Sequence, residues 1–156
     1  MRIAAALACL LLLAAPRPAV SQITAQPISN APGWRLTKPT GNVGCFARLQ
    51  GDQVDTLLST THGGVTMVLA AGRPDWKLPA DREDATLQID DGAAYRIQVA
   101  PIVNVVFGVV SDPAMANALR KARRLTWTLP IGRFSANVAG LGVAFDAVRA
   151  CIKTAG

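Results

Sequence analysis

Short runs in which apolar and polar residues alternate follow one another along the chain and predict a series of β-strands. Turn sequences rich in Gly, Asp or Pro separate these runs at 61–64, 90–92 and 130–132. The predicted strands cover 43–49, 54–60, 65–70, a hairpin over 85–99, 102–110, 125–129 and 133–138. The run 102–110 is the most apolar and predicts a central strand, in which Gly108 indicates a bulge or a close backbone approach.

Two helices are expected late in the chain. Ser111 or Asp112 can cap a helix over 114–122, with Pro113 at its first position. A second helix, over 141–153, carries one apolar stripe at helical spacing: Leu141, Ala144, Phe145, Val148, Cys151 and Ile152. The fold class is therefore α+β, with an antiparallel β-sheet of seven to eight strands, as a sandwich or a partly closed barrel, and two helices near the C-terminus.

The N-terminal residues 1–21 have the pattern of a secretory signal peptide. Arg2 precedes an apolar stretch over 3–15, and small residues at 19 and 21 mark a cleavage site after Ser21. The apolar stretch is too short to cross about 30 Å of hydrocarbon as a helix, so an uncleaved anchor is the less favoured alternative. Residues 22–33 are expected to form a flexible lead and 34–156 a single globular domain. No later segment has the length and hydropathy of a transmembrane span.

Composition and charge narrow the function classes. The 156 residues are 51% hydrophobic, which excludes a disordered chain, and the formal net charge is +6. Loss of Arg2 and Arg17 with the leader would leave a mildly basic protein in the periplasm or outside the cell. Nucleic acid is not an expected partner in that compartment.

The cysteines support export. Cys9 falls in the leader, which leaves Cys45 and Cys151. An even number of cysteines in an exported chain favours a disulfide over two buried thiols, and Cys151 is expected to face the sheet. A bridge that closes a loop of about 100 residues contributes roughly 4.7 kcal/mol in the chain-entropy model. Neither this pair nor the rest of the sequence has the spacing of a metal site, and no cofactor is expected.

The sharpest surface feature is a group of four cations, Arg120, Lys121, Arg123 and Arg124, here named the basic cluster. It could bind an anionic partner such as lipid head groups or an acidic envelope protein. Alternatively, it complements the negative end of the preceding helix.

Catalytic readings are weaker. His62 is the single histidine and could act as a general base with Ser59, Ser111 or Ser135 as the nucleophile, but it lies in a Gly-rich turn and no nucleophile-elbow pattern is present. The acidic residues Asp81, Glu83 and Asp84, and the pair Asp90 and Asp91, fit loop and turn chemistry better than a calcium loop. The three tryptophans, Trp34, Trp76 and Trp127, could line a pocket, but core positions are favoured.

A resemblance adds to this picture. The segment Arg133-Phe134-Ser135-Ala136-Asn137-Val138-Ala139-Gly140-Leu141-Gly142-Val143-Ala144-Phe145 predicts a strand ending near Gly140 and a following helix. Together with the spacing from Trp34 to Cys45, it resembles small secreted proteobacterial proteins of the invasion-associated locus B family. This resemblance implies a periplasmic, non-enzymatic protein with a role at the envelope or in host interaction.

The favoured function is therefore an exported binding or interaction protein of the bacterial envelope without a catalytic centre. Two alternatives stay open: an inhibitor or immunity-type factor, and a secreted hydrolase that uses His62 and nearby carboxylates.

Overall fold

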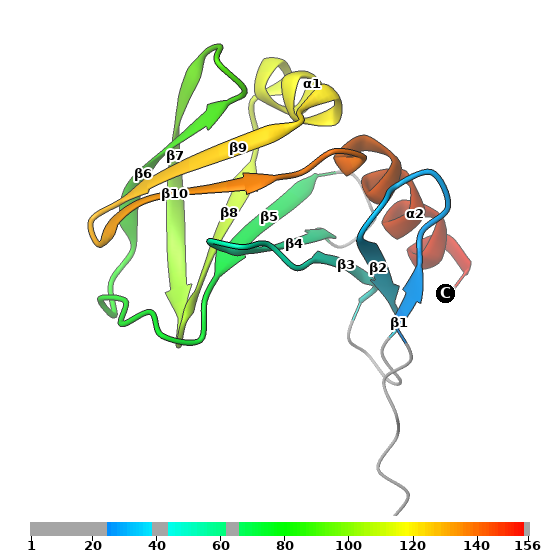
Figure 1. The fold of residues 1–156 in the computed structure, drawn as a ribbon, viewed down its shortest axis with the longest axis horizontal. Helices are drawn as coiled ribbons and strands as arrows, with labels where there is room; N and C mark the ends of the chain where they lie inside the picture. The colour runs from blue at the N-terminus through cyan, green and yellow to red at the C-terminus, as the bar shows by residue number, and fades with distance from the viewer. Residues whose placement is uncertain (1–24, 39–43, 62–65, 155–156) are drawn as a thin grey trace, which may run out of the picture.

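One antiparallel sheet of ten strands dominates the structure (Figure 1), a computed structural model that describes residues 25–38, 44–61 and 66–154. The strands are β1 (Ala25–Pro27), β2 (Trp34–Thr37), β3 (Phe46–Leu49), β4 (Asp55–Thr60), β5 (Met67–Gly72), β6 (Glu83–Ile89), β7 (Ala94–Ile102), β8 (Val105–Val110), β9 (Arg124–Leu129) and β10 (Gly132–Asn137). Their order across the sheet is β1-β2-β3-β4-β5-β8-β7-β6-β9-β10.

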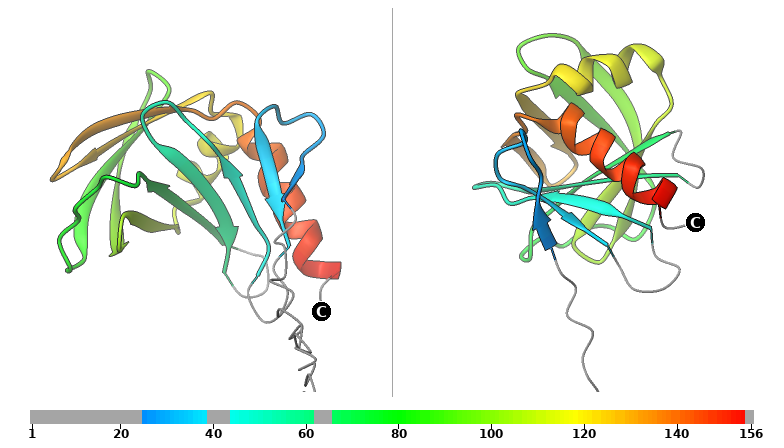
Figure 2. Two further views of the ribbon diagram at one scale, coloured as in Figure 1. Left: turned by 60° about the horizontal axis from the view of Figure 1, so that its bottom comes forward. Right: turned by 90° about the vertical axis from the view of Figure 1, so that its right-hand side faces the viewer.

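The sheet curls into a half-barrel whose inner face holds the core (Figures 1 and 2). Alternation decides which side chains point inward, because successive residues of a strand face opposite sides. In β6, for example, Ala85, Leu87 and Ile89 are buried, whereas the residues between them are partly exposed. A single continuous sheet corresponds to the partly closed barrel of the two predicted arrangements and not to the sandwich.

The strand count corrects the prediction of seven to eight, because β1 and β2 were not predicted. Residues 25–33, expected as part of a flexible lead, instead form β1 and a turn that returns the chain to β2, with Gln26 opposite Leu36. Ala31 in this turn is buried against the core. β1 and β2, of three and four residues, are not part of a longer alternating run in the sequence, and Pro27 is tolerated because β1 is an edge strand.

The predicted central strand over 102–110 is in part a hairpin. β7 continues to Ile102, Val103 and Asn104 form the turn, and β8 starts at Val105. β8 does lie inside the sheet, between β5 and β7. Gly108 marks neither of the predicted features: its register with β5 is regular and its close neighbour is a side chain, since a Cβ atom there would collide with the Ile97 side chain, whereas the nearest backbone atom would lie 3.6 Å away.

Two helices complete the fold: α1 (Pro113–Lys121), between β8 and β9, and α2 (Leu141–Thr154), after β10. Asp112 caps α1, because its Oδ1 accepts a 2.8 Å hydrogen bond from the Ala114 N–H. α2 lies across one end of the half-barrel (Figure 2, right) and packs against α1. Only α2 stands near the C-terminus, which corrects the expectation that both helices would.

A disulfide joins α2 to the start of β3. Cys45 and Cys151 are buried, 106 positions apart in sequence, with Cα atoms 6.1 Å from each other. Four other residues of the predicted apolar stripe, including Phe145 and Val148, are buried beside Cys151. The predicted pairing and the orientation of the helix are thus confirmed.

Within the described ranges, no helix combines the length and the hydropathy needed to cross a bilayer. The predicted signal peptide, 1–21, lies outside the described residues.

Candidate functional site

The outer face of the sheet, meaning the side turned away from the core, is apolar over one half. Leu57 of β4 pairs with Ala70 of β5, and Ala70 pairs with Phe107 of β8. In a neighbouring row Val68 pairs with Val109, which is 53% exposed. Ala70 is buried although it lies outside the continuous core, so its outer-face neighbours cover it. Apolar side chains therefore cover the outer face of β5 and β8 and the middle of β4, where Leu57 lies between Asp55 and Ser59 and opposite Arg48, which forms an ion pair with Asp55.

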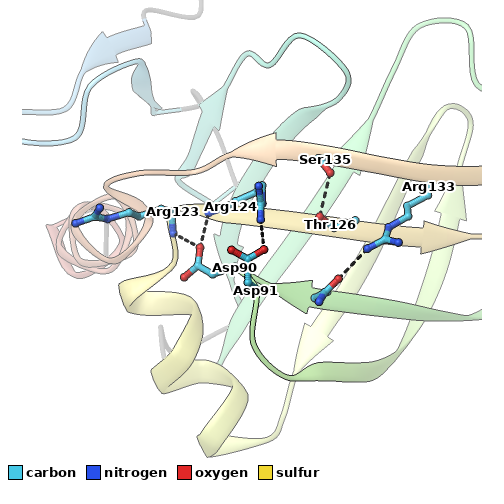
Figure 3. A network of polar contacts seen from close by, with 8 residues as sticks. Asp90, Asp91, Arg123, Arg124, Thr126, Arg133 and Ser135 are labelled. Atoms are coloured by element: carbon cyan, nitrogen blue, oxygen red, sulfur yellow. Dashed lines mark hydrogen bonds and ion pairs between the residues drawn. The ribbon is translucent and has the colours of Figure 1, made fainter.

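The other half of the outer face is polar. Thr86 of β6 pairs with Thr128 of β9, which pairs with Arg133 of β10. Beside this row the hydroxyl groups of Thr126 and Ser135 lie 2.9 Å apart across β9 and β10 (Figure 3). A solvated face on an antiparallel sheet ordinarily has this composition, so the apolar half is the unusual one.

The apolar half contains a hollow of about 230 Å³. Its lining is mostly carbon: Gly44, Phe46, Leu57, Leu58, Ser59, Val68, Ala70 and Phe107. The Ser59 hydroxyl already donates a 3.2 Å hydrogen bond to the Cys45 carbonyl oxygen. The hollow, here named the apolar hollow, therefore offers contact surface for a nonpolar group.

A second cavity, of about 420 Å³, occupies a split between β7 and β8. The last register pair between these strands is Val99 with Gly108. On the N-terminal side of Val99, β7 pairs only with β6, and on the C-terminal side of Gly108, β8 leads into α1. The lining of this split cavity is mixed: Arg82, Arg96, Ile97, Gln98, Val99, Ala100, Phe107, Val109, Ser111, Asp112 and Met115.

Phe107 lines both cavities and is half-buried. The two cavities therefore share a wall at Phe107 and are here together named the outer-face groove, with an apolar part over β3, β4 and β5 and a mixed part in the split, whose lining also includes the core residues Ile97, Val99 and Met115. The split cavity by itself falls within the range of roughly 300–1,000 Å³ that is typical of small-molecule sites, whereas the apolar hollow is smaller.

Two exposed arginines line the split cavity. Arg82 and Arg96 are exposed, and neither takes part in an ion pair within the described residues. One carboxylate, that of Asp112, lines the same cavity, but its Oδ1 accepts the capping bond of α1. Guanidinium groups match the planar geometry of a carboxylate and also bind phosphate, so this end of the groove favours an anion.

A third cavity, of about 460 Å³, lies beside the first turn of α1 and shares Val109, Ser111 and Asp112 with the split cavity. Its cation is Arg120, whose Nη2 donates to both carboxylate oxygens of Asp146 at 2.8 and 2.7 Å. The charge of Arg120 is thus already compensated, and this cavity is a weaker anion site.

The basic cluster lies where α1 ends and β9 begins, and three carboxylates face it. Asp90 Oδ1 accepts the backbone N–H groups of Arg123 and Arg124 at 2.9 and 2.8 Å, and the Arg124 side chain forms an ion pair with Asp91 (Figure 3). Asp146 pairs with Arg120. The role of the cluster in partner binding stays a prediction, but these contacts reduce its excess charge.

The described residues show no arrangement of side chains that supports the catalytic alternatives. His62 lies outside them. Asp81, Glu83 and Asp84 are at least partly exposed at the start of β6, and the described ranges contain no group of three His, Cys, Asp or Glu side chains that could hold a metal ion.

The prediction that the tryptophans belong to the core is confirmed. Trp34 and Trp127 are at most 1% exposed and Trp76 is 7% exposed. Trp76 also packs on Phe134, with ring centroids 4.8 Å apart.

Sequence reasoning missed the groove, although one signal was present. In strands with one solvated face the outward positions should be polar, yet Leu57, Val68 and Val109 occupy them. These apolar positions lie close to Arg82 and Arg96 because of the strand order, in which β8 follows β5.

Comparisons with known proteins add no identification: no family model, no curated protein and no solved structure matches this chain.

Proposed function

We propose that this protein is an exported, non-enzymatic binding protein that holds an amphiphile with an anionic head group in the outer-face groove. The observation that carries the proposal is that Phe107 lies between a largely apolar hollow and a cavity whose two arginines, Arg82 and Arg96, form no ion pair with any described residue. The acyl chain of such a ligand would lie in the apolar hollow, and its carboxylate or phosphate would face Arg82 and Arg96.

The energetics suit this class of ligand. Removing a methylene group from water contributes about 0.8 kcal/mol, so a chain that covers Leu57, Val68 and Phe107 supplies most of the affinity. Charge-assisted hydrogen bonds from the arginines would then select an anionic head over a neutral one. The groove thus separates affinity from selectivity, and each can be tested by itself.

The disulfide supports export. Disulfides persist in oxidising compartments and are rare in the cytosol. Cys45 and Cys151 lie at bonding distance, and the leader pattern over 1–21 agrees with the same destination. Both features support the proposed destination in the periplasm or outside the cell, where the protein would meet amphiphiles of the envelope.

Calorimetric titration with three ligands of equal chain length tests the proposal: decanoate and decyl phosphate, below the concentrations at which they form micelles, and decanol, below its solubility limit. We expect both anions to bind about tenfold more tightly than decanol, because a charge-assisted hydrogen bond contributes about 1.5–3 kcal/mol. The ratio of the dissociation constants of decanoate and decyl phosphate identifies the preferred head group.

Two variants test the polar and the apolar part of the groove separately. Arg96→Gln should weaken binding of the anions towards that of decanol and leave decanol unchanged, whereas Val68→Gln should weaken all three ligands. Arg133→Gln, an exposed arginine on the polar half of the outer face, is the matched control and should bind like the wild type. Absence of binding by the wild type, or equal binding of anions and decanol, would overturn the proposal.

A further inference from the structure

The split cavity follows the backbone edge of one strand. Five consecutive residues of β7, 96–100, line it. Successive residues of a strand face opposite sides of a sheet, and here the side chains of Ile97 and Val99 belong to the core, whereas Arg96 and Gln98 are exposed. Residues from both faces of a strand line one cavity where that cavity runs along the strand edge, so the split exposes the backbone of β7 as well as its side chains.

This edge of β7 has no strand beside it. Over 94–98, β7 pairs with β6, and the pairing with β8 on its other side starts only at Val99. The opposite wall of the split consists of Val109, near the end of β8, and of Ser111 and Asp112, which lead into α1. Among the described residues, therefore, no strand pairs with the side of 94–98 that faces the split, here named the free β7 edge.

A free strand edge recognises a particular chemistry. It presents backbone N–H donors and carbonyl acceptors in a row, and extended peptides bind to such edges through their own backbone. A secondary amide matches it, because the amide N–H donates to a β7 carbonyl oxygen and the amide oxygen accepts from a β7 N–H. The alkyl chain of a simple fatty acid has neither a donor nor an acceptor to offer.

The free β7 edge lies between the regions proposed for the two ends of the ligand. Ala100 pairs with Phe107, which lines the apolar hollow, and Arg96 lies four positions away along β7. Four positions of an extended strand span about 13 Å, and two amino acids in a ligand cover about 7 Å of that length. The long side chain of Arg96 would cover the remainder, so a head group of one or two amino acids fits this interval.

We infer that the ligand is an N-acylated amino acid or short N-acylated peptide. Its acyl chain would lie in the apolar hollow, its amides on the free β7 edge and its terminal carboxylate at Arg96. The inference rests on the proposed function, since it names the class of amphiphile that the outer-face groove holds. Charge agrees with an anionic end, because Asp112, whose Oδ1 caps α1, is the one carboxylate in the lining, and Asp84, opposite Gln98 on β6, lies outside it.

Calorimetric titration with three ligands that share one acyl chain tests the inference: N-decanoylglycylglycine, its analogue in which esters replace both amides, and decanoate, all below the concentrations at which they form micelles. The first two ligands have the same length and charge, but the ester analogue has no N–H donor. We expect N-decanoylglycylglycine to bind about tenfold more tightly than either of the others, because its amides gain hydrogen bonds that each contribute modestly.

Gln98→Ala is the matched control, since Gln98 has the only side-chain amide among the lining residues. The variant should keep the tenfold preference for the amide ligand, because the backbone edge is unchanged. Amide hydrogen exchange locates the contact: at equal saturation, N-decanoylglycylglycine should slow exchange over 94–98 more than decanoate does. The amide of Leu87, in a strand paired on both sides, should not respond.

The inference is wrong if the ester analogue binds as tightly as N-decanoylglycylglycine, if Gln98→Ala abolishes the preference, or if the two ligands affect exchange over 94–98 equally. The binding of decanoate separates this failure from failure of the proposed function. If decanoate binds and the amides give no advantage, the proposed function stands and only the ligand class is wrong. If none of the three ligands binds, both are wrong.

Discussion

Trp34 Nε1 donates a 3.0 Å hydrogen bond to the carbonyl oxygen of Ala139, across 105 positions of sequence. Trp34 begins β2, next to one edge of the sheet, and Ala139 follows β10 at the opposite edge. Close by, Ala31 of the first turn packs against Gly140. Side-chain and loop contacts therefore connect the two edges of the half-barrel, where a closed barrel would have a ladder of backbone hydrogen bonds.

Trp34→Phe should lower the free energy of unfolding by about 1–3 kcal/mol, because it leaves the Ala139 carbonyl without its donor and reduces buried volume. Trp127→Phe is the control, since Trp127 is equally buried but its Nε1 has no hydrogen-bond partner among the described residues. Urea denaturation of both variants measures the difference. A larger loss for Trp127→Phe would show that the hydrogen bond between the edges contributes little.

Gly140→Ala should destabilise the protein by more than 1 kcal/mol. Gly140 has φ +86°, and an added Cβ would lie 2.8 Å from Ala31 Cα, so the change combines backbone strain with a clash at the joined edges. Gly44→Ala is the control, because a Cβ there meets nothing within 4 Å. Thermal unfolding compares the two variants, and equal melting temperatures would contradict this account of the edge contact.

Sequence patterns predicted most of the fold, namely strands matching β3 to β10 and both helices, because the runs that contain these elements, such as 43–49 around β3, are long enough for alternation or helical spacing to appear. β1 and β2 have three and four residues and are defined by their pairing, such as Gln26 opposite Leu36. The break at Val103 was hidden by the continuous apolar run around it, because apolar residues occupy both faces there.

Replacing both cysteines, Cys45→Ala with Cys151→Ala, should lower the free energy of unfolding by about 2–5 kcal/mol, since the bridge restricts the unfolded chain over 106 positions. Reducing agent should shift the urea midpoint of the wild type in the same direction and leave the double variant unchanged. If the reducing agent does not alter the wild type, the disulfide does not contribute to stability.

The candidate site was less predictable than the fold. The basic cluster was visible in the sequence, but its neighbours Asp90 and Asp91 come from a different hairpin and Asp146 from α2, so their proximity depends on tertiary structure. Local sequence shows where charge is concentrated. Whether that charge is free depends on contacts between distant segments.

Asp90 gives a direct test of the basic cluster. Its carboxylate accepts two backbone N–H groups, from Arg123 and Arg124, and its own N–H donates to the Arg124 carbonyl oxygen at 2.9 Å. Asp90→Ala should lower the free energy of unfolding by about 1–3 kcal/mol, because the two donors lose their acceptor and alanine fits the φ of +51° poorly. Asp90→Asn keeps an acceptor oxygen and tolerates that φ, so it should cost less.

Replacing all four cations of the basic cluster by Gln should change stability less than Asp90→Ala does, since its ion pairs are solvent-exposed and such pairs contribute about 0–1 kcal/mol each. Urea denaturation of the wild type, of Asp90→Ala and of the Gln variant at low and high salt separates the contribution of the ion pairs from that of the Asp90 hydrogen bonds. The reason is that salt screens exposed ion pairs more than backbone hydrogen bonds. A collapse of stability in the Gln variant alone would mean that the cations themselves hold α1 and β9 in place, and that they are structural and not available to a partner.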